Sequence, residues 1–173
     1  MSSYKYTNLM EYLPKRYPAN AEQESARQIV YDFKDGYCST HLKQLIVSRI
    51  KDIMNIYPYE DWEVCFIPAS THMKSVKRYT SLCEYIKEHT SCTSHVNTIS
   101  AIHDEEAGHI SGKKSNPEEN FEVDTENVRG KSIILIDDVI TRGRTFCNTA
   151  DKLTNYGASR VVGLFVAKTV HPE

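Results

Sequence analysis

Residues 132–145 read SIILIDDVITRGRT, and this stretch decides the fold class. Its first five residues are almost all aliphatic, which is typical of a β-strand buried on both faces. Two acidic residues, Asp137 and Asp138, follow directly, and a polar turn containing Gly143 comes next. The chain then enters a segment with helical periodicity. A buried strand joined by a short turn to a helix is the repeating unit of a parallel sheet.

The same alternation extends to both sides of this stretch. Short apolar runs predict strands, and apolar residues spaced three and four positions apart predict helices. We expect strands over 63–67, 96–102, 132–136 and 161–167, and helices over 40–57, 75–88 and 145–156. This order predicts an α/β fold with a central, mainly parallel sheet flanked by helices. With a length of 173 residues, we expect residues 1–173 to form a single domain.

Residues 1–40 and 103–128 lack this regularity. In the first segment, residues 1–28 are rich in tyrosine and are interrupted by Pro14 and Pro18, which predicts an irregular arm, with one short helix as an option. The apolar run 29–33 that follows is too short to be assigned to a strand or to a helix end. The second segment carries eight acidic residues and no periodicity, which predicts a long flexible loop or lid.

Composition excludes several classes of protein. Hydrophobic residues make up 40 % of the chain and charged residues 25 %, which is ordinary globular usage and excludes a fibrous or disordered protein. The net charge of −2 argues against capture of nucleic acid by bulk electrostatics. No stretch approaches the roughly 18 apolar residues that a membrane span needs, and the first residues do not resemble a secretory signal. We therefore expect a soluble, cytoplasmic protein.

Two of the five cysteines lie in a cluster whose spacing is compatible with a metal. Cys83, His89, Cys92 and His95 fall within thirteen residues, and zinc accepts both ligand types. The alternative is that Cys83 is a small core residue on the apolar face of the predicted helix. We favour the core role, and the odd number of cysteines indicates reduced thiols rather than a disulfide framework.

The residues after the strand at 132–136 indicate a ligand. Adjacent carboxylates behind a buried aliphatic run are costly unless they meet hydroxyl groups or a cation. Ribose hydroxyls would satisfy Asp137 and Asp138, and so would Mg²⁺ held together with substrate phosphates. The turn that follows leads into a helix N-terminus, where backbone N–H groups and the helix dipole favour an anion. One short segment therefore predicts a site for a sugar 5-phosphate.

The run ILIDDVITRGRT resembles the phosphoribosyl pyrophosphate (PRPP) signature of the type I phosphoribosyltransferases. The resemblance implies their α/β core, with a small hood from the N-terminal region (residues 1–40) and a lid loop (103–128). It also implies that Asp137 and Asp138 hold the ribose hydroxyls and that the turn wraps the 5-phosphate. The residues implied for ribose and 5-phosphate binding are Asp137, Asp138, Val139, Ile140, Thr141, Arg142, Gly143, Arg144 and Thr145. Arg142 departs from the small residue or Thr that is common at its position.

Weaker resemblances extend over residues 60–170. Ala69, Ser70 and Thr71 stand where the family has its pyrophosphate loop, although an ordinary strand–helix connection is the alternative. Residues 67–86, which contain Lys77-Arg78-Tyr79, and residues 109–121 look like segments of ComF-like members. The lid would bring Lys113 and Lys114 onto the diphosphate as catalytic cations, unless it is only a polar surface loop.

The family resemblance implies transfer of ribose 5-phosphate from PRPP to a nitrogenous acceptor, with Mg²⁺ as cofactor and pyrophosphate as product. Thr141 stands where purine 6-oxo members have an acidic residue, which argues against hypoxanthine or guanine as the acceptor. His103 and His109 are the candidate bases in the loop, and the acceptor stays unidentified. A homodimer is the oligomeric state that the family suggests.

Two other classes of function stay open at this point. The first is a non-catalytic regulator that binds PRPP or a nucleotide without turnover. The second is a salvage- or repair-linked phosphohydrolase, or a relic that binds no ligand. Release of pyrophosphate from PRPP separates the transferase from both.

Overall fold

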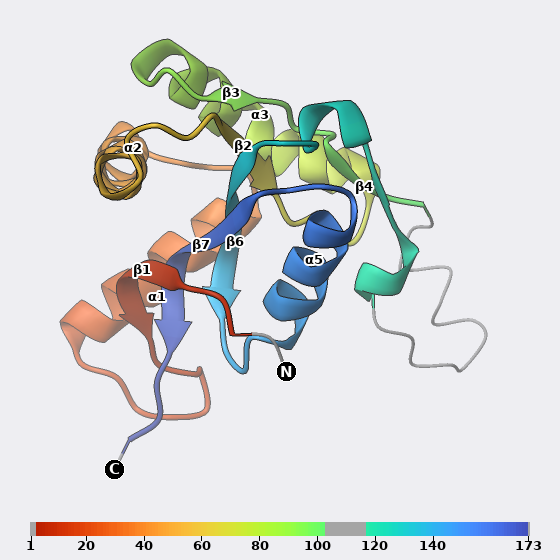
Figure 1. Ribbon diagram of the computed structural model, residues 1–173. Coiled ribbons are helices and arrows are strands. Elements are labelled where there is room, and N and C mark those ends of the chain that lie inside the picture. The colour runs from red at the N-terminus through yellow and green to blue at the C-terminus, as the bar shows by residue number, and fades with distance from the viewer. Residues whose placement is uncertain (1–2, 103–116, 173) are drawn as a thin grey trace.

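The computed structural model describes residues 3–102 and 117–172. Its centre is a five-stranded sheet in the order β1-β7-β6-β2-β3, in which all neighbouring strands are parallel. The strands are β1 (Tyr6–Tyr12), β2 (Trp62–Phe66), β3 (Thr93–Ser94), β6 (Ser132–Ile140) and β7 (Arg160–Thr169). The helices are α1 (Ala21–Lys34), α2 (Thr40–Ile56), α3 (His72–His89) and α5 (Arg144–Asn155) (Figure 1). The α/β class predicted from the sequence is confirmed.

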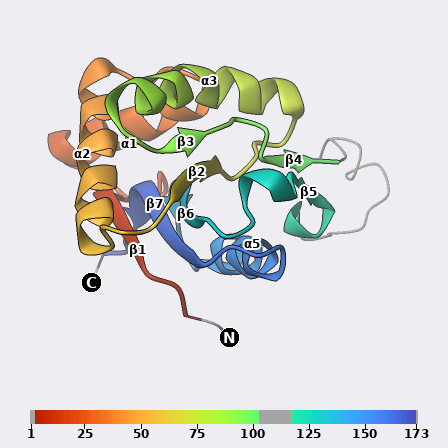
Figure 2. The same cartoon turned by 45° about the horizontal axis from the view of Figure 1, so that its top comes forward.

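Helices cover both faces of the sheet, as the alternating pattern predicts. In Figure 2, α1, α2 and α3 lie on one side and α5 lies on the other. The first layer encloses a core around Phe33, Ile50 and Tyr79. The second encloses a core around Phe146 and Leu153. Both cores consist mainly of buried apolar side chains, so helices and their side chains cover most of the sheet on its two faces.

A small second sheet lies beside the main one. It pairs β4 (Ile99–Ala101) antiparallel with β5 (Phe121–Val123), and short 3₁₀ turns at Pro117–Asn120 and Thr125–Asn127 flank β5. The strand expected over 96–102 is therefore shorter than predicted and belongs to this sheet rather than to the central one. Thr93–Ser94, only two residues long, takes the edge position beside β2. A strand of this length carries no periodicity, so the sequence could not reveal it.

The prediction of an irregular arm over residues 1–28 is wrong where β1 forms, whereas the optional short helix is present and is longer than expected. Residues 1–40 contribute β1, an edge strand paired along β7, and the 14-residue helix α1. β1 was missed because an edge strand buries little, so its apolar alternation is weak. Helix α1 begins at a capping box between Asn20 and Gln23, and the run 29–33 is its last part.

Of the loop predicted over 103–128, residues 117–128 form the two 3₁₀ turns and β5, and the remainder lies outside the described residues. The strand predicted over 132–136 continues to Ile140, because β7 keeps pairing with β6 as far as Lys168. Asp137 and Asp138 therefore lie within the last part of a strand rather than in the turn after it.

The four residues considered for zinc have separate partners. Cys83 contacts Ser94, and Cys92 contacts the Met54 sulfur. The His89 ring stacks on a tyrosine, and His95 Nδ1 lies 2.9 Å from a carboxylate oxygen of the buried Glu63. Within residues 3–102 and 117–172, no group of three or more His, Cys, Asp or Glu side chains is arranged to hold a metal ion.

The sequence predicted no membrane-spanning stretch, and the helices of the structure bear on this point. Among the residues that the structure describes, no helix combines the length and the apolar character that crossing a bilayer requires.

Candidate functional site

The predicted site lies at the edge of the sheet where the parallel strands end, which is where open α/β sheets bind ligands. Asp137 Oδ1 accepts hydrogen bonds from the Asp138 backbone N–H at 2.8 Å and from the Tyr79 hydroxyl at 3.4 Å. Asp138 Oδ1 accepts from the Val139 N–H at 2.7 Å. Local bonds to the backbone thus fix both carboxylates at the end of β6.

Burial dominates the acidity of Asp137. Desolvation raises its pKa well above the ordinary value, and the neighbouring Asp138 carboxyl raises it further. The hydrogen bond from the Asp138 N–H and the Arg78 guanidinium act in the opposite direction and are smaller effects. A buried carboxyl with a raised pKa is stabilised by groups that donate hydrogen bonds to its ionised form, and sugar hydroxyls are such donors.

Two cations from distant parts of the chain approach the acidic pair. Lys34, in the last turn of α1, places its Nζ 3.7 Å from Asp138 Oδ2. Arg78, on α3, donates from Nε to the Lys34 carbonyl oxygen at 3.3 Å. The C-terminal end of α1 and the first half of α3 therefore meet near the acidic pair. The sequence indicated Arg78 only as part of the segment that resembles ComF-like members, and it did not indicate Lys34, which lies about a hundred positions before Asp138.

Tyr79 connects the two loops of the predicted site. Its side chain is fully buried, stacks on Phe66 and donates from its hydroxyl to the Ile67 carbonyl at 2.7 Å. The same hydroxyl lies 3.4 Å from Asp137 Oδ1. Burial raises the pKa of Tyr79 well above its usual value, so the hydroxyl stays protonated and able to donate. The sequence places Tyr79 in the helix predicted over 75–88 but does not indicate this contact.

The turn before α5 has the backbone form that an anion site requires. Gly143 is the N-cap residue, with φ 77° and ψ 8°, and it supplies no side-chain hydrogen bond to the helix. The helices α1, α2 and α3 are all capped by a side chain, from Asn20, Ser39 and Thr71 respectively. The α5 N-terminus therefore lacks the internal acceptor that the others have, which favours an external anion.

The remaining residues predicted around the turn differ in exposure, and Thr145, in the first turn of α5, is half-buried. Val139 and Ile140 contribute side chains to the two apolar cores, so only their backbone is available to a ligand. Thr141, Arg142 and Arg144 are exposed. The Thr141 hydroxyl lies 2.7 Å from that of Thr169 at the end of β7. Hydroxyl and cationic groups thus surround the turn, as a phosphate would require.

The predicted pyrophosphate loop already has internal partners. The Ala69 N–H donates to Ser75 Oγ at 2.8 Å, and Thr71 Oγ1 accepts from the Lys74 N–H as the cap of α3. Lys74 Nζ donates to Ser70 Oγ at 3.3 Å. Ser70 and Lys74 are the groups here that lie toward solvent, so a diphosphate role for Ala69, Ser70 and Thr71 stays a prediction.

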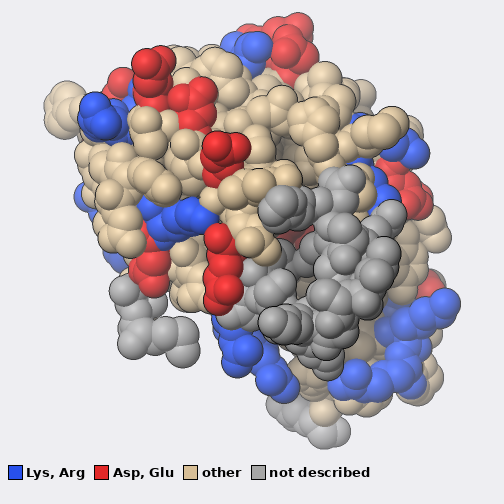
Figure 3. All heavy atoms as spheres, turned by 90° about the vertical axis from the view of Figure 1, so that its right-hand side faces the viewer, with Lys and Arg blue, Asp and Glu red and all other residues tan. Residues whose placement is uncertain are grey.

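The four loop residues predicted to act in catalysis, Lys113, Lys114, His103 and His109, lie outside the described residues. The charge of the visible surface is compatible with an anionic ligand. In Figure 3, Lys and Arg side chains gather near the lower end of the molecule, the end at which the arrows of β6 and β7 finish in Figure 1.

A family model matches about half of the chain. Residues 85–169 match the family model of the phosphoribosyl transferase domain, and this range contains β6, the Gly143 turn and β7. This match supports the assignment of the chain to the phosphoribosyltransferases. The search of curated proteins produced no match.

Two crystal structures of a hypoxanthine-guanine phosphoribosyltransferase from Bacillus anthracis are similar to this chain. The first has a TM-score of 0.40 and 18 % identity, and the match covers 76 % of this chain and 68 % of the other. The second, which holds a HEPES molecule in its active site, has a TM-score of 0.42 and 18 % identity, covering 81 % and 75 %. A likeness of this degree carries no conclusion about the substrate.

Proposed function

We propose that the protein transfers ribose 5-phosphate from PRPP to a nitrogenous acceptor and releases pyrophosphate. One observation carries the proposal: a single continuous segment presents two carboxylates at the end of β6 and then a glycine-capped helix N-terminus. The first part can accept hydrogen bonds from ribose hydroxyls, and the second can donate them to a phosphate. The match to the phosphoribosyl transferase domain supports this interpretation.

In this proposal each part of the site has one task. Asp137 and Asp138 orient the ribose through its hydroxyl groups, and the turn from Thr141 to Thr145 holds the 5-phosphate. Ser70 and Lys74 lie at the start of α3, close enough to each other to share one anionic group, which supports diphosphate binding there. Tyr79 positions Asp137 and the loop after β2 relative to each other.

The donor set suits Mg²⁺ as the family's usual cofactor. Magnesium is commonly held by one or two carboxylates together with substrate phosphates, and Asp138, with Asp137 beside it, is the carboxylate available for this role. Within the described residues no third metal-binding side chain completes a site, so the remaining ligands would come from the donor and from water. Bound Mg²⁺ would neutralise charge on the diphosphate.

The chemistry is a substitution at the anomeric carbon. The bond from C1 to the diphosphate oxygen breaks, a bond from C1 to the acceptor nitrogen forms, and the electron pair of the broken bond leaves with pyrophosphate. The chain contributes positioning, because fixed contacts to ribose and 5-phosphate hold C1 between the leaving group and the acceptor. Cations near the diphosphate stabilise the charge that develops on it. We also propose that residues 1–40 and 103–128 border the acceptor.

A regulatory protein that binds PRPP without turnover is the second candidate. The Lys34–Asp138 contact favours it, because a cation of the chain itself already engages one of the two carboxylates. A ligand would then displace Lys34, which gives the molecule two arrangements that binding can switch between.

Pyrophosphate release tests the proposal. The protein is incubated with Mg²⁺, PRPP and pooled nitrogenous bases and amines, and pyrophosphate is measured over time. We expect release that depends on the pool and is lost in Asp137→Asn/Asp138→Asn. The control Asp52→Asn/Glu88→Gln, which changes two exposed acids, keeps the release of the native chain. PRPP binding without release assigns the regulatory role, and no binding contradicts both.

A further inference from the structure

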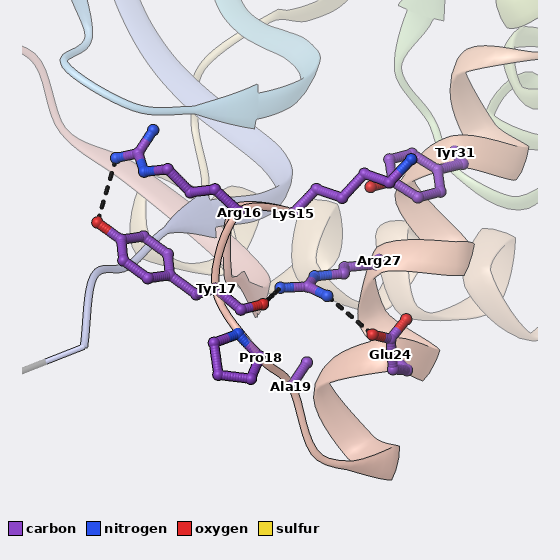
Figure 4. A pocket seen from close by; sticks show the side chains of 8 residues that line it. All are labelled: Lys15, Arg16, Tyr17, Pro18, Ala19, Glu24, Arg27 and Tyr31. Atoms are coloured by element: carbon purple, nitrogen blue, oxygen red, sulfur yellow. Dashed lines mark hydrogen bonds and ion pairs between the residues drawn. The ribbon is translucent and has the colours of Figure 1, made fainter.

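A pocket of about 390 Å³ lies between the loop after β1 and the first half of α1. Its size falls within the range of small-molecule sites. Figure 4 shows that Lys15, Arg16 and Tyr17 border it from the loop and that Tyr31 borders it from the helix. None of these residues belongs to the PRPP site described above.

The wall of this pocket is held in one conformation by a buried arginine. Arg27 is 4 % exposed, and its guanidinium donates to the carbonyl oxygens of Leu13, Pro14 and Tyr17 at 2.7–2.8 Å. It also donates to Glu24 at 2.8 Å. Four hydrogen bonds from one planar group fix three points of the loop at once, so the pocket does not depend on a ligand to form.

The pocket lies at the same end of the parallel sheet as the last residues of β6. Tyr31 stands one helical turn before Lys34, whose Nζ is 3.7 Å from Asp138 Oδ2. The Tyr31 hydroxyl lies 3.3 Å from that of Tyr12, the last residue of β1. Hydrogen bonding to Tyr31 is the main effect that raises the pKa of Tyr12, and the charge of Asp138 adds to it. The loop after β1 and the end of β6 thus share one edge of the parallel sheet.

The charges and rings that line the pocket define the ligand chemistry. Glu24 is engaged by Arg27, so the exposed cations Lys15 and Arg16 leave the pocket positive. Arg16 stacks over the Tyr17 ring at 4.9 Å from its centroid, and Figure 4 shows the Lys15 side chain extending toward Tyr31. Cations and tyrosine rings that line the same pocket suit a flat ligand with an anionic substituent.

We propose that this pocket binds the acceptor and that the acceptor is a planar ring carrying an anionic group, such as a carboxylate. This inference rests on the proposed function, because it takes the neighbouring site to hold the phosphoribosyl donor. The cations bind the anionic group and a tyrosine packs against the ring. The acceptor nitrogen then faces the end of β6.

Acid and amide pairs of equal shape test the inference. Pyridine-3-carboxylate is compared with pyridine-3-carboxamide, and 2-aminobenzoate with 2-aminobenzamide, in titrations followed by NMR of the full chain without PRPP. We expect at least one acid to bind tenfold or more tightly than its amide, with shifts at Tyr17 and Tyr31. In Lys15→Met/Arg16→Met the acid should lose that advantage, leaving less than a twofold difference.

The control Lys51→Met/Lys87→Met removes two exposed cations elsewhere and keeps the native preference. Equal binding of acid and amide to the native chain overturns the inference, as does a preference that survives the loss of Lys15 and Arg16. Calorimetry of Mg–PRPP on the same samples separates the two proposals. Donor binding without any acid preference overturns only the acceptor assignment, whereas acid preference without donor binding overturns the proposed function.

Discussion

Asp137 is the residue that we propose to bind the ribose hydroxyls, although its surroundings disfavour the charged carboxylate. Its carboxyl is buried beside a second acid, and both effects raise its pKa. The native state therefore holds this proton more tightly than the unfolded chain, in which an aspartate titrates near 3.9. The free energy of unfolding must therefore fall as the pH rises from that value toward the raised pKa, because over this pH range the native state binds more protons than the unfolded chain does.

Asp137→Asn removes this dependence, since the amide cannot ionise but keeps an oxygen that can accept from the Asp138 N–H. We expect the variant to unfold at a higher temperature than the native chain at pH 7, and the difference to shrink toward pH 4. Each pKa unit of elevation corresponds to about 1.4 kcal/mol. Scanning calorimetry between pH 4 and pH 8 measures this, and parallel curves for the two proteins contradict it.

Tyr79→Phe removes the hydroxyl that donates to the Ile67 carbonyl and approaches Asp137. We expect a loss of about 1–2 kcal/mol in the free energy of unfolding, because a buried acceptor loses its partner. PRPP affinity should also fall, as both loops lose their common contact. Urea denaturation and calorimetry measure the two effects. Tyr59→Phe is the control, because Tyr59 is 99 % exposed and neither quantity should change.

At the scale of elements, the turn before α5 depends on a glycine with positive φ. Gly143 has a φ of 77°, and Gly130, in the turn before β6, has a φ of 75°. A Cβ at Gly143 would meet only Ile140 at 3.6 Å, and one at Gly130 would meet nothing within 4 Å. The two positions therefore carry similar backbone strain without a clash, but they lie at opposite ends of β6.

Comparing substitutions at these two glycines separates the effect of backbone strain on stability from the effect on PRPP binding. Gly143→Ala and Gly130→Ala should each lower the free energy of unfolding by about 1–2 kcal/mol, the cost of a left-handed residue with a Cβ. Only Gly143→Ala should also weaken PRPP binding, because it alters the start of α5. Denaturation and calorimetry on both variants test this. Equal PRPP affinity in the two variants would show that the Gly143 turn does not contribute to PRPP binding.

The elements that the sequence predicted well are those with dense local signals. The helix at α2 and the buried strand at β2 have periodic or continuous apolar residues, and both agree with the structure within about one residue. β1 could not be predicted, because an edge strand is stabilised by pairing with β7 rather than by its own burial. The continuation of β6 to Ile140 likewise depends on β7, which lies about 25 positions later in the chain.

At the scale of the whole molecule, the matched family segment is not a self-sufficient structure. Residues 85–169 contain β6 and β7 but not β1 or β2, their outer partners in the sheet. They also lack α1 and α2, which cover one face. A fragment of residues 85–173 should therefore show no cooperative thermal transition, whereas the full chain should show one. A sharp calorimetric transition in the fragment would contradict this view of the core.

The candidate site shows the same division between local and long-range information. The segment 137–145 could be predicted because carboxylates, glycine and helix start are contiguous in the chain. Lys34, Arg78 and Tyr79 approach it only through the packing of α1 and α3, which no local pattern specifies. The pocket at Lys15 was hidden for the same reason, since its wall exists through the contacts of Arg27.

The central claim is that the acidic pair and the helix start after it bind a phosphorylated pentose. Titration calorimetry with Mg–PRPP measures this on the native chain and on Asp137→Asn/Asp138→Asn. We expect saturable binding to the native chain and a loss of about 100-fold or more in the variant, since two charge-assisted hydrogen bonds of about 1.5–3 kcal/mol each are removed. Absence of binding to the native chain, or equal affinity in the two proteins, would contradict the claim.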